Sequence, residues 1–219
     1  KERIATEQRR ALESERRALE AQLRMLQAQI EPHFLFNTLG AVQQLAEQGA
    51  PQAARLTANL ITFLRSSMHE IRNDKVSLAT EFQLVQAYLD VMKIRMGSRL
   101  SFQFELPEDC ATVMIPGMSV LTLAENAIKH GLEAKTGGGT IWIIARQHEN
   151  NVAVTVADDG MGLGSETAGT GIGLKNVRER LQLAYGMAAS FVLVGNFPSG
   201  VAATITVPLA VRVSTATGV

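Results

Sequence analysis

Three short segments in the C-terminal half of the chain could together hold a nucleotide. Residues 158–162 read Asp-Asp-Gly-Met-Gly, residues 169–174 read Gly-Thr-Gly-Ile-Gly-Leu, and residues 125–130 read Glu-Asn-Ala-Ile-Lys-His. They offer a carboxylate for a base, an amide oxygen for Mg²⁺ and bare backbone N–H groups for phosphates. Upstream, residues 32–37 read Pro-His-Phe-Leu-Phe-Asn and supply a histidine that could receive a phosphoryl group.

Asp158 is the residue in these segments that could select a base. It follows an apolar stretch that predicts a strand, so a buried carboxylate there could accept a hydrogen bond from the exocyclic amine of adenine, which guanine lacks. Gly160 and Gly162 lack a Cβ and tolerate positive φ, so the backbone could pass close to the purine. An Asp-Gly turn without any ligand is the structural alternative.

The second glycine segment leads into a predicted helix. Glycines before a helix N-terminus expose N–H groups, and the helix dipole favours phosphate there. A flexible linker is the alternative reading, because the segment does not follow a strand. The nucleotide contacts expected from this segment are Gly169, Thr170, Gly171, Ile172, Gly173 and Leu174.

The third segment could hold a metal ion and phosphate. Asn126, Lys129 and His130 are three and four residues apart, so all three can project from one side of a helix. The Asn126 amide offers an oxygen to Mg²⁺ that bridges phosphates, and Lys129 offers a point charge to phosphate oxygens. Otherwise, Lys129 would be a solvated lysine and His130 a partner of the helix dipole.

A helical N-terminal part would have to present the histidine. Residues 1–31 are polar with a heptad seam, which predicts a two-stranded coiled coil; a single solvated helix is the alternative. Residues 32–73 hold two helical patterns on either side of a Gly-Ala-Pro turn, which predicts a hairpin that forms a four-helix bundle in a dimer. The heptad seam consists of Leu19, Leu23, Leu26 and Ile30.

Residues 74–209 mix helix and strand patterns, and residues 210–219 read as a tail. One helix is expected from Pro116 to His130, because proline suits the first turn of a helix. The fold class is therefore α+β, with the helical region followed by an α/β sandwich. Other helices are expected at 78–95 and 175–185, and strands at 100–106, 140–146, 152–157, 190–194 and 201–207.

Composition sets outer limits on the function. The 219 residues are 46% hydrophobic with zero formal net charge, which fits one or two folded domains and gives no sign of a nucleic-acid partner. The single cysteine, Cys110, excludes an intrachain disulfide and favours a reducing compartment. No signal peptide or membrane-spanning run is found, and we expect any membrane segment to precede Lys1, which is not a Met start.

In this order, the three segments resemble the N, G1 and G2 boxes of the GHKL superfamily, which joins gyrase-type ATPases and histidine kinases on the Bergerat fold. The resemblance covers residues 113–209 and implies that ATP and Mg²⁺ bind, with adenine on Asp158 and the metal on Asn126. It also implies that hydrolysing members carry a glutamate one helical turn before the asparagine. Thr122 occupies that position, and Glu125 points about 100° away from Asn126, so transfer of the γ-phosphoryl group is favoured over hydrolysis.

Residues 29–37 resemble the phosphoacceptor segment of LytS/YehU-type sensor histidine kinases, and the similarity extends over nearly all of residues 24–209. It implies a homodimer in which His33 takes the γ-phosphoryl group and passes it to an aspartate of a response regulator, with a LytTR-type protein as the candidate. It also implies a place in the cytoplasmic part of an inner-membrane sensor.

The residue that keeps His33 nucleophilic is left open. Asn37 lies one turn on and could hold the other ring nitrogen, and Glu125 could approach from the ATP-binding part. Glu31 is close in sequence, but Pro32 obscures its direction. The alternatives to a histidine kinase are a GHKL switch without kinase activity, a scaffold with a degenerate pocket, and a serine kinase of the anti-sigma type.

Overall fold

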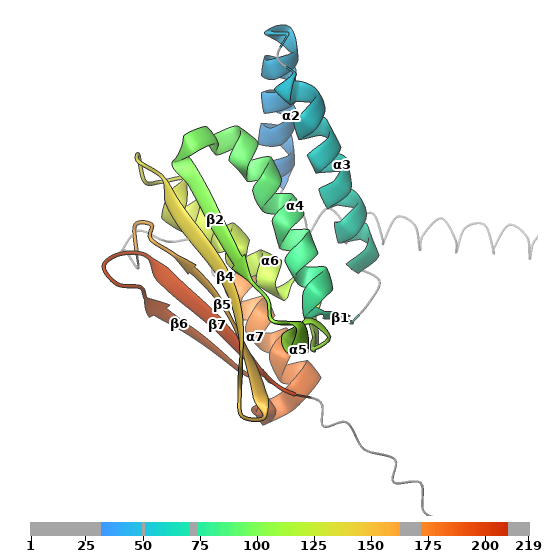
Figure 1. Cartoon of the computed structure of the whole chain (residues 1–219), viewed down its shortest axis with the longest axis vertical. Helices are drawn as coiled ribbons and strands as arrows, with labels where there is room; N and C mark the ends of the chain where they lie inside the picture. The colour runs from blue at the N-terminus through green and yellow to red at the C-terminus, as the bar shows by residue number, and fades with distance from the viewer. Residues whose placement is uncertain (1–31, 50, 71–73, 163–171, 210–219) are drawn as a thin grey trace, which may run out of the picture. The chain divides into compact units, whose positions relative to one another are not determined.

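The computed structural model describes residues 32–49, 51–70, 74–162 and 172–209 (Figure 1). The predicted coiled coil of residues 1–31 and the tail of residues 210–219 lie outside the described residues. The chain divides into two compact units, Lys1–Arg55 and Leu56–Val219. Within the described residues, no helix combines the length and the apolar character that a bilayer crossing requires.

Two helices occupy the region of the predicted hairpin. They are α2 (Pro32–Glu47) and α3 (Gln52–Glu70), which confirms both helical patterns. Proline fits the first residue of α2 because it has no N–H group to leave unpaired there. In the second unit, Phe63 of α3 is fully buried, and its ring centroid lies 5.9 Å from that of Tyr88 on the next helix.

A five-stranded sheet forms the centre of the second unit, in the order β2-β4-β5-β7-β6. The β2 and β4 strands are parallel, and the other neighbours are antiparallel. All five predicted strands are confirmed, and in β4, β5 and β7 every second residue over most of the strand is buried on the covered side of the sheet. The strands are β2 (Leu100–Glu105), β4 (Gly139–His148), β5 (Asn151–Asp158), β6 (Ser190–Gly195) and β7 (Val201–Pro208).

Three helices cover one face of this sheet (Figure 1). They are α4 (Leu78–Met96), α6 (Ser119–Asn126) and α7 (Ile172–Tyr185). The inner faces of sheet and helices form one apolar core, so the fold class is α+β with an α/β sandwich. Fully buried core residues include Leu84, Leu89, Leu100, Val120, Ile141, Ile143, Val152, Val154, Ile205 and Val207.

The region before α6 differs from the prediction. The short strands β1 (Lys75–Ser77) and β3 (Met114–Pro116) form a separate two-stranded sheet, with Lys75 opposite Pro116. The prediction that Pro116 opens a helix is therefore wrong, because Pro116 ends a strand. The chain then turns through Met118, which has φ 60°, and α6 begins at Ser119. The remaining short elements are α5 (Glu108–Ala111) and the 3₁₀ turns Gly97–Arg99 and Gly186–Ala188.

Candidate nucleotide-binding site

Asp158 is a buried carboxylate at the end of the central strand β5. It is 2% exposed, as its place after an apolar strand predicted. Its Oδ1 accepts a hydrogen bond of 2.8 Å from the Gly160 N–H. Burial raises the pKa of the Asp158 carboxyl, while hydrogen bonds from the backbone of Gly160 and Val201 act in the opposite direction. An amine donor such as that of adenine would therefore meet a carboxylate largely removed from water.

A π-helix brings the N-box segment against this carboxylate. The α-helix α6 ends at Asn126 and continues as the π-helix Ala127–Leu132, in which Glu133 N donates to Ile128 O at 2.8 Å. A Cβ atom at Gly131 would lie 2.6 Å from Asp158 Oδ1, so only glycine fits there. Gly131 was not among the predicted site residues, although it directly follows the N-box segment.

The two glycines of the G1 box (residues 158–162), Gly160 and Gly162, have different structural roles. Gly162 has φ 80° and turns the chain, as expected. Gly160 has no positive φ; instead, a Cβ atom there would lie 2.4 Å from the Gly131 carbonyl carbon. Its missing side chain allows the loop and the π-helix to touch backbone to backbone.

Asp159 anchors the same loop through hydrogen bonds and one ion pair. Its Oδ1 accepts a 2.8 Å hydrogen bond from Thr140 N and lies 4.0 Å from Lys135 Nζ. Its carbonyl oxygen accepts bonds from Lys135 Nζ at 2.5 Å and Ser199 Oγ at 3.1 Å. These contacts hold the preceding residue, Asp158, in position.

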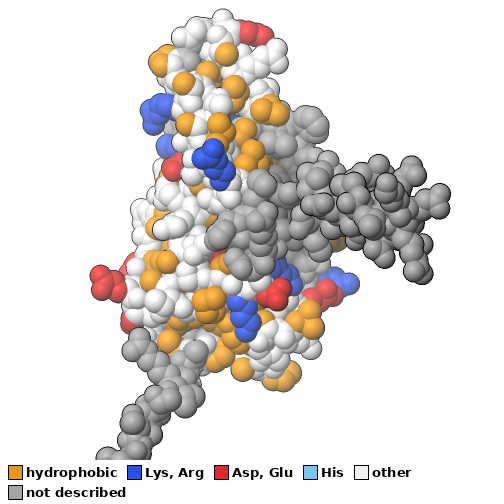
Figure 2. All heavy atoms as spheres, turned by 90° about the vertical axis from the view of Figure 1, so that its right-hand side faces the viewer, with side chains coloured by type: hydrophobic (Ala, Val, Ile, Leu, Met, Phe, Trp, Pro, Cys, Tyr) orange, Lys and Arg blue, Asp and Glu red, His pale blue; other side chains and the backbone are white. Residues whose placement is uncertain are grey.

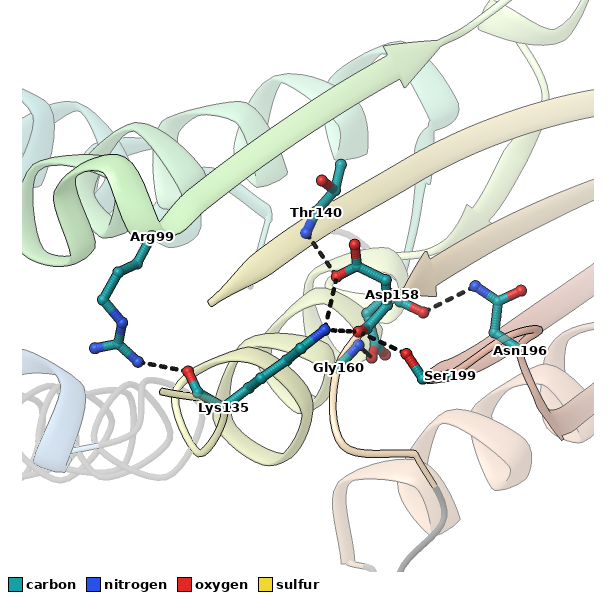
Figure 3. A network of polar contacts seen from close by, with 8 residues as sticks. Arg99, Lys135, Thr140, Asp158, Gly160, Asn196 and Ser199 are labelled. Atoms are coloured by element: carbon teal, nitrogen blue, oxygen red, sulfur yellow. Dashed lines mark hydrogen bonds and ion pairs between the residues drawn. The ribbon is translucent and has the colours of Figure 1, made fainter. Parts of the chain in front are cut away.

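Two further side chains complete this support (Figure 3). Arg99 donates to the carbonyl of Lys135 at 2.9 Å, and Asn196 Nδ2 donates to the carbonyl of Asp158 at 2.8 Å. Sequence reasoning did not find Arg99, Lys135 or Asn196, because each acts on backbone atoms of residues far away in the chain.

Asn126 and the start of α7 lie side by side. The Asn126 Nδ2 group donates to Thr122 O at 2.7 Å, which leaves Oδ1 as the atom suited to a hard cation. A Cβ atom at Gly173 would lie 3.7 Å from Asn126 Nδ2 and 3.2 Å from Thr122 Cγ2. The helix N-terminus expected to hold phosphate is thus next to the asparagine expected to hold the metal.

The side chain of Thr122, beside Asn126 and the start of α7, has no carboxylate that could act as a base towards water. Its hydroxyl donates to Met118 O at 2.8 Å, and its methyl group faces Gly173. Glu125, three residues after Thr122 and directly before Asn126, is half-buried on α6. At the position where hydrolysing members of the superfamily are expected to carry a glutamate, the chain therefore presents the Thr122 methyl group to the start of α7.

The other predicted site residues are distributed as follows. Lys129 is exposed and His130 half-buried, both in the π-helix, where the predicted α-helical spacing from Asn126 does not apply. Ile172 and Leu174 lie in the first turn of α7. His33 and Asn37 lie on α2, in the first compact unit. Gly169, Thr170 and Gly171 lie outside the described residues.

Comparisons with known proteins place this site in a family. The model of the family described as "Histidine kinase" matches residues 21–100. The model described as "Histidine kinase-, DNA gyrase B-, and HSP90-like ATPase" matches residues 118–211.

Individual relatives agree with these matches. Sensor histidine kinase YesM of Bacillus subtilis is 33% identical over 184 residues, covering 82% of this chain and 32% of the relative. Sensor protein LytS of Staphylococcus haemolyticus is 33% identical over 174 residues, covering 74% of this chain and 30% of the relative. The chain thus spans about a third of the length of these curated relatives.

Among solved structures, the histidine kinase domain of a blue-light activated histidine kinase from Erythrobacter litoralis shares the fold. The two have a TM-score of 0.50 at 18% identity, over 88% of this chain and 93% of the other.

Fold and site together define the class of ATP-binding domain that gyrase B and histidine kinases share. Within that class, the chain belongs to the LytS/YehU-type sensor histidine kinases of the GHKL superfamily.

Proposed function

We propose that this chain is the kinase region of a two-component sensor that phosphorylates His33 from ATP. The imidazole nitrogen of His33 attacks the γ-phosphorus, the bond to the β-γ bridging oxygen breaks, and ADP leaves with the electron pair. The phosphoryl group then passes from histidine to an aspartate of a response regulator, for which a LytTR-type protein is our candidate. Such transfer depends on positioning and charge neutralisation, which are the two things this site offers.

One observation carries the proposal: the start of α7 lies beside Asn126 and Thr122, and the π-helix that follows Asn126 packs through Gly131 against the buried Asp158. Adenine would bind Asp158, while Gly160 and Gly162 would shape the loop beside it.

The polar end of the nucleotide would bind the helix termini. Mg²⁺ would bind Asn126, with Lys129 and His130 near the phosphates. Backbone N–H groups of residues 169–174 would complete the phosphate site.

The identity of the base that assists His33 is a separate proposal. Asn37 follows His33 by four residues on α2, which is about one helical turn. Its amide could fix the imidazole tautomer, whereas Glu125 is the carboxylate that the nucleotide-binding part could contribute.

We further propose that the chain acts as a homodimer on the cytoplasmic side of an inner membrane. The division into a signalling coiled coil (1–31), a phosphoacceptor hairpin (32–73) and an ATP-binding domain (74–209) belongs to this proposal. Figure 2 shows apolar side chains open to solvent over the helical part of the chain, and Ile61 of α3 is 46% exposed. An exposed apolar helix face is suited to a bundle between two copies.

The test is incubation with γ-labelled ATP and Mg²⁺, followed by acid and alkali treatment of the labelled protein. We expect label that is lost in acid and survives alkali, which is typical of a phosphoramidate. The His33→Gln protein should carry no label, while the control His148→Gln, altered at an exposed histidine at the end of β4, should be labelled normally.

Three other outcomes would contradict the proposal. Acid-stable label would indicate a serine or threonine kinase. Steady release of phosphate without a labelled protein would indicate an ATP-driven switch. Failure to bind a non-hydrolysable ATP analogue with Mg²⁺ would indicate a scaffold.

A further inference from the structure

Glu81 is a fully buried carboxylate that caps the helix carrying Asn126. It lies in the first turn of α4 and accepts hydrogen bonds from the N–H groups of Met118, Val120 at 2.8 Å and Leu121 at 3.4 Å. The residue at the N-cap of α6 is Met118, whose side chain makes no cap hydrogen bond. A buried negative charge is stabilised there because the N–H groups and the helix dipole both favour an anion.

Lys75 makes the opposite contact with the other nucleotide-binding helix. Its Nζ donates to the Ala184 carbonyl at 3.1 Å and lies 3.9 Å from the centre of the Tyr185 ring. Ala184 and Tyr185 are the last residues of α7, where a helix dipole favours a cation. The Tyr185 hydroxyl also donates to the carbonyl of Met114 on β3, so the end of α7 is tied to the β1–β3 sheet at two points.

The two contacts come from one short segment of chain. Lys75 on β1 and Glu81 on α4 are six residues apart, and neither belongs to the nucleotide-binding segments. Each residue contacts the helix end that lies away from the expected ligand. Glu81 caps the start of α6, and Asn126 is the last residue of that helix. Lys75 contacts the end of α7, and the first turn of that helix faces Asn126.

We propose that Glu81 and Lys75 are positioning residues that set the separation between Asn126 and the phosphate-binding start of α7. The proposal deepens the proposed function and rests on it. Glu81 lies on α4, which packs against α3 through Tyr88 and Phe63, and Lys75 lies on β1, which leads directly into α4. A displacement of α4 would therefore reach both nucleotide-binding helices through these two side chains.

The experiment measures binding of a non-hydrolysable ATP analogue by calorimetry, with Mg²⁺ and with EDTA. We expect Glu81→Gln to lose most of the increase in affinity that Mg²⁺ gives, by about 10- to 100-fold, as supporting contacts behind a metal ligand usually do. Its affinity for ADP in EDTA should stay near that of the unmodified protein, because Asp158 is untouched. Glu81→Asp, which retains the charge, should recover part of the Mg²⁺ effect.

Lys75→Met provides an independent measurement at a half-buried position, so the proposal does not depend on folding of a Glu81 variant. We expect the Lys75→Met variant to weaken binding of the ATP analogue more than binding of ADP. The matched controls are Glu105→Gln, on the exposed side of β2, and Lys93→Met, which alters a lysine near the other end of α4; both should bind as the unmodified protein does.

Variants that lower the melting temperature but keep the full Mg²⁺ effect and the full preference for ATP would overturn the proposal and leave a purely structural role. A failure of the unmodified protein to bind the analogue would instead overturn the proposed function, and this inference with it.

Discussion

Gly131 lies in direct contact with the carboxylate of Asp158: a Cβ atom at Gly131 would be 2.6 Å from Oδ1 and 3.0 Å from Cγ. The backbone of Gly131 is also the surface against which Gly160 packs, at 2.4 Å for a Cβ atom on Gly160. Two absent side chains thus allow a π-helix and a loop to enclose one buried acid. The position of that acid, and with it any contact to adenine, depends on this close approach.

Replacing Gly131 with alanine should weaken nucleotide binding about tenfold, because overpacking of this kind costs roughly 1–3 kcal/mol and forces the Asp158 carboxylate to move. Binding of ADP measured by calorimetry checks this. Gly137→Ala is the control, since a Cβ atom at Gly137 meets nothing within 4 Å. Equal affinities of the two variants would show that the carboxylate does not contact the base.

Replacing Asp158 with asparagine should remove nucleotide binding yet stabilise the ligand-free fold at neutral pH. Burial raises the pKa of the Asp158 carboxyl above its ordinary value of 3.8. The folded protein therefore binds this proton more tightly than the unfolded chain does. The ionised carboxylate costs stability above the folded-state pKa, and the cost vanishes as the pH falls below 3.8.

The measurement is urea denaturation of Asp158→Asn and unmodified protein over a range of pH. The gain in free energy of unfolding should be largest at neutral pH and shrink towards zero in acid. Asp159→Asn serves as the control and should show no such gain, because Asp159 accepts its bond from Thr140 N at 2.8 Å at a partly exposed site. A gain for Asp158→Asn that stays constant with pH would contradict the assignment to the buried charge.

Gly173→Ala should weaken binding of the ATP analogue several-fold while changing the stability of the ligand-free protein by less than about 1 kcal/mol. The new methyl group would lie 3.2 Å from Thr122 Cγ2, which pushes α7 away from Asn126, while alanine favours the helix by about 1 kcal/mol over glycine.

The double variant Gly173→Ala with Thr122→Ser should recover binding. Serine removes the crowded Cγ2 and keeps the hydroxyl that donates to Met118 O. Recovery would assign the effect to the spacing of the two helices; no recovery would assign it to the loss of glycine itself.

Sequence patterns predicted the parts of this site that depend on local chemistry. The burial of Asp158 followed from an apolar strand that ends in Asp-Asp-Gly. The strand at 100–106 followed from alternation of apolar residues, and those at 140–146 and 152–157 followed from apolar, β-branched composition. The role of Gly131 did not follow, because it depends on a π-helix that forms where the N-box helix packs against β5, and a π-helix has no local sequence pattern of its own.

Contacts between segments far apart in the chain were the other part of the structure that the sequence did not predict. The strands β1 and β3 have three residues each, too few for a periodic pattern, and their pairing moved the start of the helix from Pro116 to Ser119. Glu81 reads in sequence as an ordinary glutamate in the first turn of a helix. Only the fold reveals that its carboxylate caps another helix about 40 residues further along the chain.

Placing a glutamate at position 122 should convert phosphoryl transfer into hydrolysis. Thr122 lies one helical turn before Asn126, and its methyl group faces the start of α7, where the phosphates would bind. A carboxylate there could accept a proton from an attacking water molecule, a contribution that is typically worth about 100-fold or more in rate. Thr122→Glu should therefore release phosphate from ATP about 100-fold faster than Thr122→Gln, which has a similar shape but is not a base.

The labelling of His33 should fall in the glutamate variant as water competes for the γ-phosphoryl group. Both variants must first be shown to bind the ATP analogue with similar affinity, because each places a longer side chain against Gly173. Equal phosphate release by the two would mean that residue 122 does not decide between water and histidine. The outcome would then depend on the distance between His33 and the γ-phosphate. Fixing that distance, for example by cross-linking the hairpin to the ATP-binding domain, should then change the labelling of His33 while Thr122 stays unchanged.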